Sequence, residues 1–253
     1  MRALVTNDDG IDSPGIAALA AVAGELGLEV TVAAPAWNSS GASASITGVS
    51  SDNRLVVSAR TLSEAAHAHA FAVEASPAMI VRVGVRGGFG FDSPPDLVLS
   101  GINDGPNTGR AVLHSGTVGA ALTAATHGCR CVAFSLGVHA ADATPDYDAA
   151  TAVARRVIPW ALEAPAPLAL NVNVPSGKAD ALRGFRHAHL ATFGAVDTQV
   201  TVLDGGQLHI HFSEIDPTGE PGSDATLLSQ GYATVTALNP VCETDKLALI
   251  GLV

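Results

Sequence analysis

Basic residues are scarce in this chain. Only 13 lysines and arginines stand against 24 aspartates and glutamates, which gives a formal net charge of −11 at pH 7. Proteins that bind DNA, RNA or an anionic membrane surface need a stripe of positive charge that attracts phosphate groups. The composition therefore argues against nucleic-acid polymers and membranes as partners. A small phosphorylated ligand has to be received by a metal ion or by backbone dipoles.

Cysteines and long apolar runs are also few. Cys129, Cys131 and Cys242 lack the C-x-x-C spacing of a zinc site, and we interpret them as small core residues. No apolar run approaches the roughly 18 residues that span a bilayer, and the first residues do not resemble a secretory signal. We therefore expect a cytoplasmic protein.

Apolar residues, in contrast, make up 47% of the chain and follow an alternating pattern of strands and helices. Short apolar runs predict buried strands at residues 2–6, 29–34, 71–75, 97–100, 131–136 and 168–172. Helical spacing of apolar residues predicts helices at residues 13–27, 77–85, 116–127 and 146–162. This alternation is typical of an α/β fold with an open, mostly parallel sheet.

The pattern changes after residue 175. Strand-like segments at residues 183–190, 198–203 and 207–212 are separated by turns, which favours hairpins, and a helix at 224–230 and a strand at 232–238 follow. We therefore expect three parts. Residues 1–180 form an α/β core with the functional site, residues 181–222 form a protruding β-hairpin extension, and residues 223–253 return to the core.

Three polar segments follow predicted strands, at residues 7–10, 38–41 and 100–117. Ligands of open α/β sheets bind outside the carboxyl ends of the strands, where these segments should converge. Asp8 and Asp9 can share a target only where the backbone turns, and Gly10 permits such a turn. Two neighbouring carboxylates repel unless one is protonated or a cation such as Mg²⁺ or Mn²⁺ lies between them. The alternative is that Asp8 caps a turn while Asp9 is solvated.

A second candidate site lies at Ser115, Gly116 and Thr117, which open a helix directly after a loop. Backbone N–H groups and the helix dipole make such a position suitable for an anion. Ordinary N-capping by Ser115 is the alternative. A P-loop or G-x-G-x-x-G motif in the right context is absent, which weakens an ATPase or dehydrogenase interpretation.

Several motifs occur together and in one order along the chain. They are T-N-D-D-G at 6–10, S-G-A-S at 40–43, P-D-L-V-L-S-G-I-N at 95–103, G-P-N at 105–107, S-G-T-V-G-A-A at 115–121, and G-S-D at 222–224 with G-Y-A-T-V-T-A-L at 231–238. In this arrangement the chain resembles, over nearly its whole length, the SurE (survival protein E) family of metal-dependent 5′/3′-nucleotidases.

The resemblance implies a Rossmann-like core with helices on both faces of the sheet and a C-terminal hairpin that joins subunits into homodimers or homotetramers. It implies one divalent metal ion per subunit, Mg²⁺ or Mn²⁺ with Ca²⁺ as an alternative occupant, held by Asp8, Asp9, Ser40 and Asn103. The implied activity is that of a phosphomonoesterase that hydrolyses nucleoside 5′- or 3′-monophosphates to nucleoside and phosphate.

Asp8 and Asp9 would also be the catalytic residues. Either could orient or deprotonate the attacking water, with Asp9 favoured, and an aspartyl-phosphate on Asp8 stays open. The residues expected to contact the substrate and its phosphate are Asn38, Gly41, Asn107, Ser115, Gly116 and Thr117.

The chain departs from the family pattern beside Asn38. Ala36, Trp37 and Ser39 stand where many members carry an acidic residue, an arginine and a further basic residue, and His114 replaces a common tyrosine. Trp37 could stack on a base or simply pack in its loop. This departure leaves two alternatives open: a nucleotide-binding or regulatory protein of the same fold with lost turnover, and a phosphatase for a specialised nucleotide-like metabolite.

Overall fold

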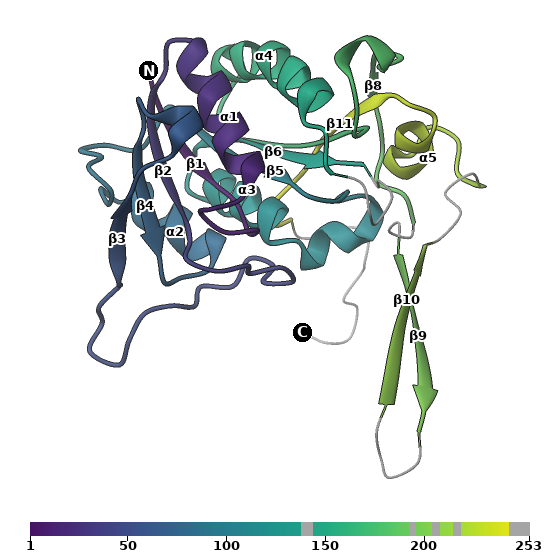
Figure 1. The fold of residues 1–253 in the computed structure, drawn as a ribbon, viewed down its shortest axis with the longest axis horizontal. Coiled ribbons are helices and arrows are strands. Elements are labelled where there is room, and N and C mark those ends of the chain that lie inside the picture. The colour runs from purple at the N-terminus through teal and green to yellow at the C-terminus, as the bar shows by residue number, and fades with distance from the viewer. Residues whose placement is uncertain (138–143, 193–195, 204–207, 215–218, 243–253) are drawn as a thin grey trace, which may run out of the picture.

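The computed structural model describes residues 1–137, 144–192, 196–203, 208–214 and 219–242 (Figure 1). The helices are α1 (Pro14–Glu25), α2 (Pro77–Gly84), α3 (Gly116–Thr126), α4 (Asp148–Glu163) and α5 (Asp224–Ser229), with short 3-10 helices η1 (Ser63–Ala65), η2 (Gly109–His114) and η3 (Ala179–Ala181). The strands are β1 (Arg2–Thr6), β2 (Glu29–Pro35), β3 (Val57–Arg60), β4 (His69–Val73), β5 (Leu97–Asn103), β6 (Arg130–Leu136), β7 (Leu168–Val174), β8 (Phe185–His187), β9 (Val196–Val202), β10 (Leu208–Glu214) and β11 (Ala233–Ala237).

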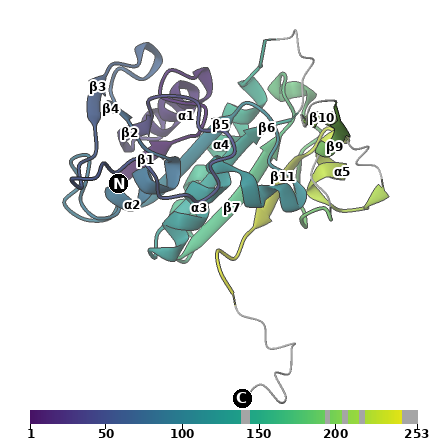
Figure 2. The same ribbon diagram turned by 90° about the horizontal axis from the view of Figure 1, so that it is seen from below.

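The main sheet has the strand order β3-β4-β2-β1-β5-β6-β7-β11-β8. All pairs from β4 to β7 are parallel, and β11 and β8 are also parallel, whereas β3 with β4 and β11 with β7 are antiparallel. From β1 the chain builds outward to β2 and β4 on one side and later to β5, β6 and β7 on the other. The direction in which strands are added to the sheet therefore reverses between β1 and β5. Open α/β sheets bind ligands at this kind of position. Figure 2 shows β5, β6 and β7 side by side.

Helices cover both faces of this sheet. On one face, apolar residues of α1 and α4 pack on the β1 residues Ala3 and Val5. On the other face, residues of α2 and α3 pack on Leu4, which points the opposite way because side chains alternate along a strand. The predicted α/β fold with a mostly parallel sheet and helices on both faces is confirmed. Among the described residues, no helix has the length and apolar character needed to cross a membrane.

Two strands and one cysteine differ from the sequence-based expectation. β5 continues past residue 100 to Asn103, because a register shift after Ser100 lets the strand pair again with β6, opposite Ser135. The edge strand β3 was not predicted, since it has only four residues and all of them are exposed. The third difference is Cys242, which is exposed, whereas Cys129 and Cys131 are buried as expected.

The C-terminal extension is smaller than expected. Part of the segment at 183–190 forms β8, which belongs to the main sheet through its pairing with β11. Of the described residues in this extension, β9 and β10 form a separate antiparallel hairpin, which projects away from the body of the molecule in Figure 1. The side chains of Val200, Val202 and Leu208 on this hairpin are exposed.

Candidate functional site

The three polar segments predicted from the sequence meet at Asp8. The first segment contains Asp8 and directly follows β1. In the loop after β2, the Ser39 N–H donates to the Asp8 carbonyl oxygen at 2.6 Å. The Thr117 hydroxyl of α3 donates to Asp8 Oδ1. The end of β5 joins them, because the Asp104 N–H donates to Asp9 Oδ2 at 3.2 Å. Segments that are far apart in the sequence thus converge at the carboxyl edge of β1 and β5.

The turn that presents the two carboxylates is held by Asn7. Its amide nitrogen donates to the Gly10 carbonyl oxygen at 2.9 Å and to the Ser13 hydroxyl at 2.7 Å, while its amide oxygen accepts the Gly10 N–H at 3.2 Å. Gly10 has a φ of +101°, a conformation that L side chains rarely adopt. Asn7 is fully buried and was not singled out from the sequence, although it lies within the T-N-D-D-G motif.

The two carboxyl groups are electrostatically unfavourable in their ionised form. Burial raises the pKa of Asp8. Hydrogen bonds from the Thr117 hydroxyl and from the backbone N–H groups of Thr117 and Gly116 lower this pKa, but by less than burial raises it. Burial, followed by the neighbouring charge of Asp8, raises the pKa of Asp9 to about 6. No basic side chain of the described residues forms a salt bridge with either carboxylate.

The start of α3 is packed directly against Asp8. A Cβ atom at Gly116 would lie 2.8 Å from both Cβ and Oδ2 of Asp8, closer than real Cβ contacts. Ser115 is the N-cap, and its hydroxyl accepts the Val118 N–H at 3.1 Å. The capping that the sequence offered as an alternative is therefore present, and the N–H groups of Gly116 and Thr117 face the Asp8 carboxylate.

Ser40 follows and Asn103 precedes a residue that hydrogen-bonds to this pair. Ser40 follows the Ser39 anchor and is exposed, and its N–H donates to the side-chain oxygen of Asn38 at 2.9 Å. The Asn103 amide nitrogen donates to the Gly105 carbonyl oxygen at 2.7 Å, which leaves the Asn103 side-chain oxygen as the available ligand atom. Gly41 has a φ of +80° and open space where a Cβ would stand. Asn38 was expected to contact the substrate. In the structure its side-chain oxygen accepts a hydrogen bond within its own loop and so shapes that loop.

Asn107 is the centre of a hydrogen-bond network beneath the loop that leads to α3. Its side-chain nitrogen donates to the Ser135 hydroxyl at 2.8 Å, and its N–H donates to Asn173 Oδ1 at 2.8 Å. Its carbonyl oxygen accepts from Asn171 at 2.7 Å and from Asn173 at 3.0 Å. This network fixes the loop to β6 and β7. The sequence did not indicate Asn171 and Asn173, because they lie within an ordinary buried strand.

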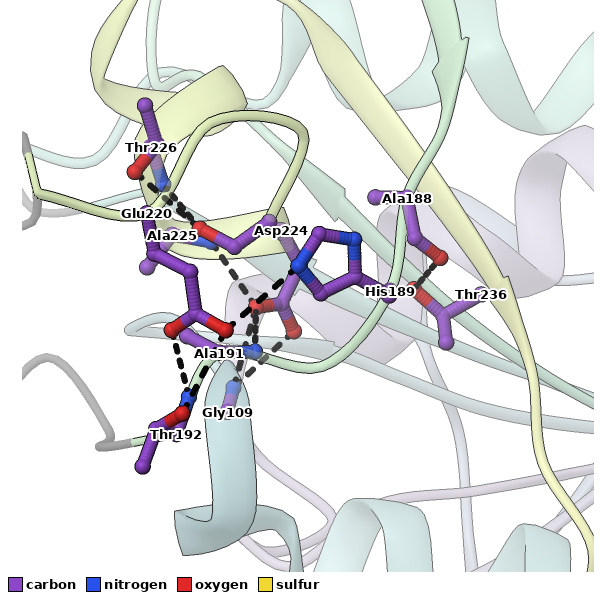
Figure 3. A network of polar contacts seen from close by, with 11 residues as sticks. Gly109, Ala188, His189, Ala191, Thr192, Glu220, Asp224, Ala225, Thr226 and Thr236 are labelled. Carbon is purple, nitrogen blue, oxygen red and sulfur yellow. Dashed lines mark hydrogen bonds and ion pairs between the residues drawn. The ribbon is translucent and has the colours of Figure 1, made fainter.

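Asp224 fixes the other end of the same loop (Figure 3). This fully buried carboxylate accepts the Gly109 N–H at 2.9 and 3.1 Å, the Ala191 N–H at 2.9 Å and the Ala225 N–H at 2.8 Å. Burial raises its pKa, while these backbone donors lower it. Asp224 therefore joins η2, the segment after β8 and the start of α5. The G-S-D motif marked this segment, but no local signal revealed its partners.

Comparisons with known proteins identify the family of this chain. Residues 3–195 match the family described as Survival protein SurE. The chain is 38% identical to 5′-nucleotidase SurE of Anaeromyxobacter sp. (strain Fw109-5), covering 94% of this chain and 90% of that protein, and 36% identical to 5′-nucleotidase SurE of Ruegeria pomeroyi, covering 97% and 96%. The crystal structure of the SurE protein from Aquifex aeolicus superposes with a TM-score of 0.79 at 28% identity, covering 96% of this chain and 95% of that one. The resemblance seen in the motifs is confirmed, and this chain belongs to the SurE family.

Proposed function

We propose that this protein is a metal-dependent 5′-nucleotidase that hydrolyses nucleoside monophosphates to nucleoside and phosphate, with Asp8 and Asp9 at its reaction centre. Its relatives in Anaeromyxobacter and Ruegeria, with which it shares more than nine-tenths of its length, are named 5′-nucleotidase SurE. The observation that carries the proposal is the pair of adjacent carboxyl groups at the switch point of the sheet, for which the described part of the chain supplies no basic partner.

The residues at this position fit a hard divalent cation. Asp8, Asp9, Ser40 and Asn103 offer only oxygen atoms, which Mg²⁺ and Mn²⁺ prefer. Among the described residues, no group of three or more histidine, cysteine or acidic side chains is arranged to hold a metal, so the serine hydroxyl and the amide oxygen would complete the set. A cation here would counteract the burial and the repulsion from Asp8 that together raise the pKa of Asp9.

A bound divalent ion would offset the negative charge of the phosphoryl group and lower the pKa of water. Asp9 is the more exposed carboxylate of the pair, and we assign to it the proton of the attacking water. The water oxygen then bonds to phosphorus and the bond from phosphorus to the ribose oxygen breaks. The ribose oxygen takes up a proton from solvent, and Asp9 later returns to solvent the proton that it accepted. Asp8 stays oriented by the Thr117 hydroxyl, and the N-terminus of α3 contributes its dipole to the phosphate.

The test is phosphate release from AMP and GMP with Mg²⁺ or Mn²⁺, with and without chelator. We expect chelator to abolish release and Asp9→Asn to lower kcat by about 100-fold or more, the usual contribution of a general base. Asp12→Asn serves as a matched control, because Asp12 is an exposed carboxylate in the same turn region. Release that persists in chelator, or an Asp9→Asn variant as active as the Asp12→Asn variant, would refute the mechanism.

We also propose that the β9–β10 hairpin joins subunits into a homodimer or homotetramer. Val200 and Val202 alternate along β9 and therefore share one face, and Leu208 pairs directly with Val202. The exposed fractions of these three side chains are 56%, 76% and 60%, which is costly for apolar groups that stay in water. Replacing Val200 and Val202 with serine should lower the mass measured by light scattering to that of a smaller species, and an unchanged mass would contradict the proposal.

A further inference from the structure

A hollow of about 410 Å³ opens on the loop after β2, which carries Ser39 and Ser40. It is formed by the loop after β2 and by the residues that lead into α2, and its walls include Trp37, Ser40, Ser45, Thr47 and Ser76. Its size falls in the range of small-molecule sites. No lysine, arginine, aspartate, glutamate or histidine is among its lining residues, so its walls offer a ligand hydroxyls, backbone groups and apolar surface.

The hollow shares its wall with the loop that is anchored to Asp8. Ser40, a proposed metal ligand, is one of its walls, and the N–H of the preceding residue Ser39 donates to the Asp8 carbonyl oxygen. A substrate whose phosphate lies at Asp8 and Asp9 would therefore extend its other end into this hollow.

Trp37 presents a large apolar surface there. Its exposed fraction is 51%, although indole rings are usually buried when nothing needs them at the surface. The backbone on both sides of Trp37 is fixed, by the Ala36 N–H that donates to the Val73 carbonyl oxygen at 2.9 Å and by the Ser39 anchor on Asp8. The indole is thus attached to a constrained backbone, which lowers the entropic cost of using it as a binding surface.

We infer that this hollow binds the base of the substrate nucleotide, with the base stacked on the indole of Trp37. The inference rests on the proposed nucleotidase function and adds the source of base recognition to it. Every nucleobase has a neutral aromatic face that stacks on tryptophan. Ser40, Ser45 and Thr47 have no hydrogen-bond partner for their hydroxyls within the described part of the chain, so these groups can reach polar atoms of the ribose or base.

Kinetics with two kinds of substrate separate base binding from phosphate binding. In Trp37→Ala, kcat/KM for AMP should fall about tenfold, mainly through KM, as expected for loss of a base–aromatic stack. The value for ribose 5-phosphate, which has no base, should stay unchanged, and Trp37→Phe should keep most of the AMP activity. Trp160→Ala is the matched control, because Trp160 is similarly exposed at 57% but lies in a different hollow. Equal losses for AMP and ribose 5-phosphate, or no loss for AMP, would overturn the inference.

Adenosine binding tests the inference without catalysis. In the Trp160→Phe variant Trp37 is the only tryptophan, so quenching of tryptophan fluorescence by adenosine in chelator reports a stacked base directly. We expect adenosine and AMP to quench and ribose 5-phosphate not to quench. Absence of quenching by adenosine would overturn the inference even if AMP is hydrolysed. Quenching without any phosphate release would instead contradict the proposed nucleotidase function and leave base binding supported.

Discussion

Substitution of Gly116 by alanine should disable the proposed reaction centre while leaving the fold intact. The added Cβ would lie 2.8 Å from Asp8 Cβ and Oδ2, whereas ordinary contacts begin at 3.4 Å, so the start of α3 and Asp8 must separate by about 0.6 Å. Displacements approaching 1 Å in a catalytic arrangement cost roughly 100-fold in rate. We therefore expect kcat/KM for AMP to fall by about 30-fold to 100-fold.

The stability of the Gly116→Ala variant should change little. Alanine is favoured over glycine in a helix by about 1 kcal/mol, which offsets part of the steric cost, and no positive φ opposes a side chain at this position. The assays are kcat/KM for AMP, the dissociation constant of Mn²⁺ and the melting temperature. Gly219→Ala is the control, because a Cβ there meets no described atom within 4 Å. A folded Gly116→Ala protein with wild-type rate and metal affinity would refute the reasoning.

Three further predictions concern Thr117, Asp224 and Asp9. Thr117→Val removes the hydroxyl that orients Asp8 and should weaken Mn²⁺ binding measured by calorimetry about 10-fold to 100-fold, whereas Thr123→Val on the same helix should not. Asp224→Ala leaves at least two buried N–H groups without an acceptor and should lower the free energy of unfolding in urea by about 3 kcal/mol; a loss below about 1 kcal/mol would contradict the role of this carboxylate. In chelator the pKa of Asp9 is about 6, against 3.8 for an unperturbed group. The folded protein therefore holds this proton more tightly than the unfolded chain, and the free energy of unfolding that is present below pH 3.8 decreases as the pH rises through about 6. The melting temperature of the metal-free protein should therefore fall over this interval, Asp9→Asn should flatten that fall, and a rise would show that the sign is wrong.

The location of the site was predictable because it depends on topology. Runs of buried apolar residues identified the parallel strands, and polar residues that follow such strands must gather at one edge of the sheet. Asp8 and Asp9 after β1 and Asn103 at the end of β5 lie at that edge, next to the point where the strand order reverses. The order of the motifs likewise predicted the family.

The groups that hold this edge in place were not predictable. Asn107 bonds to Asn171 and Asn173, and Asp224 bonds to Gly109, so the partners are more than 60 residues apart in each case. No local spacing encodes such pairs, because the fold itself brings the partners together. For the same reason the assignment of β8 to the main sheet depends on β11, which follows it in the chain by more than 40 residues.

Asp224 also has a consequence for how the protein is made. A growing chain contains Asp8, Ser40 and Asn103 well before Asp224 has been synthesised, and until then the Gly109 and Ala191 N–H groups lack their acceptor. A nascent chain that ends near residue 195 would hold every proposed metal ligand but not the carboxylate that secures the loop before α3. The loop before α3 can therefore reach its hydrogen-bonded arrangement only after residue 224 has been synthesised, later than the segments that carry the proposed metal ligands.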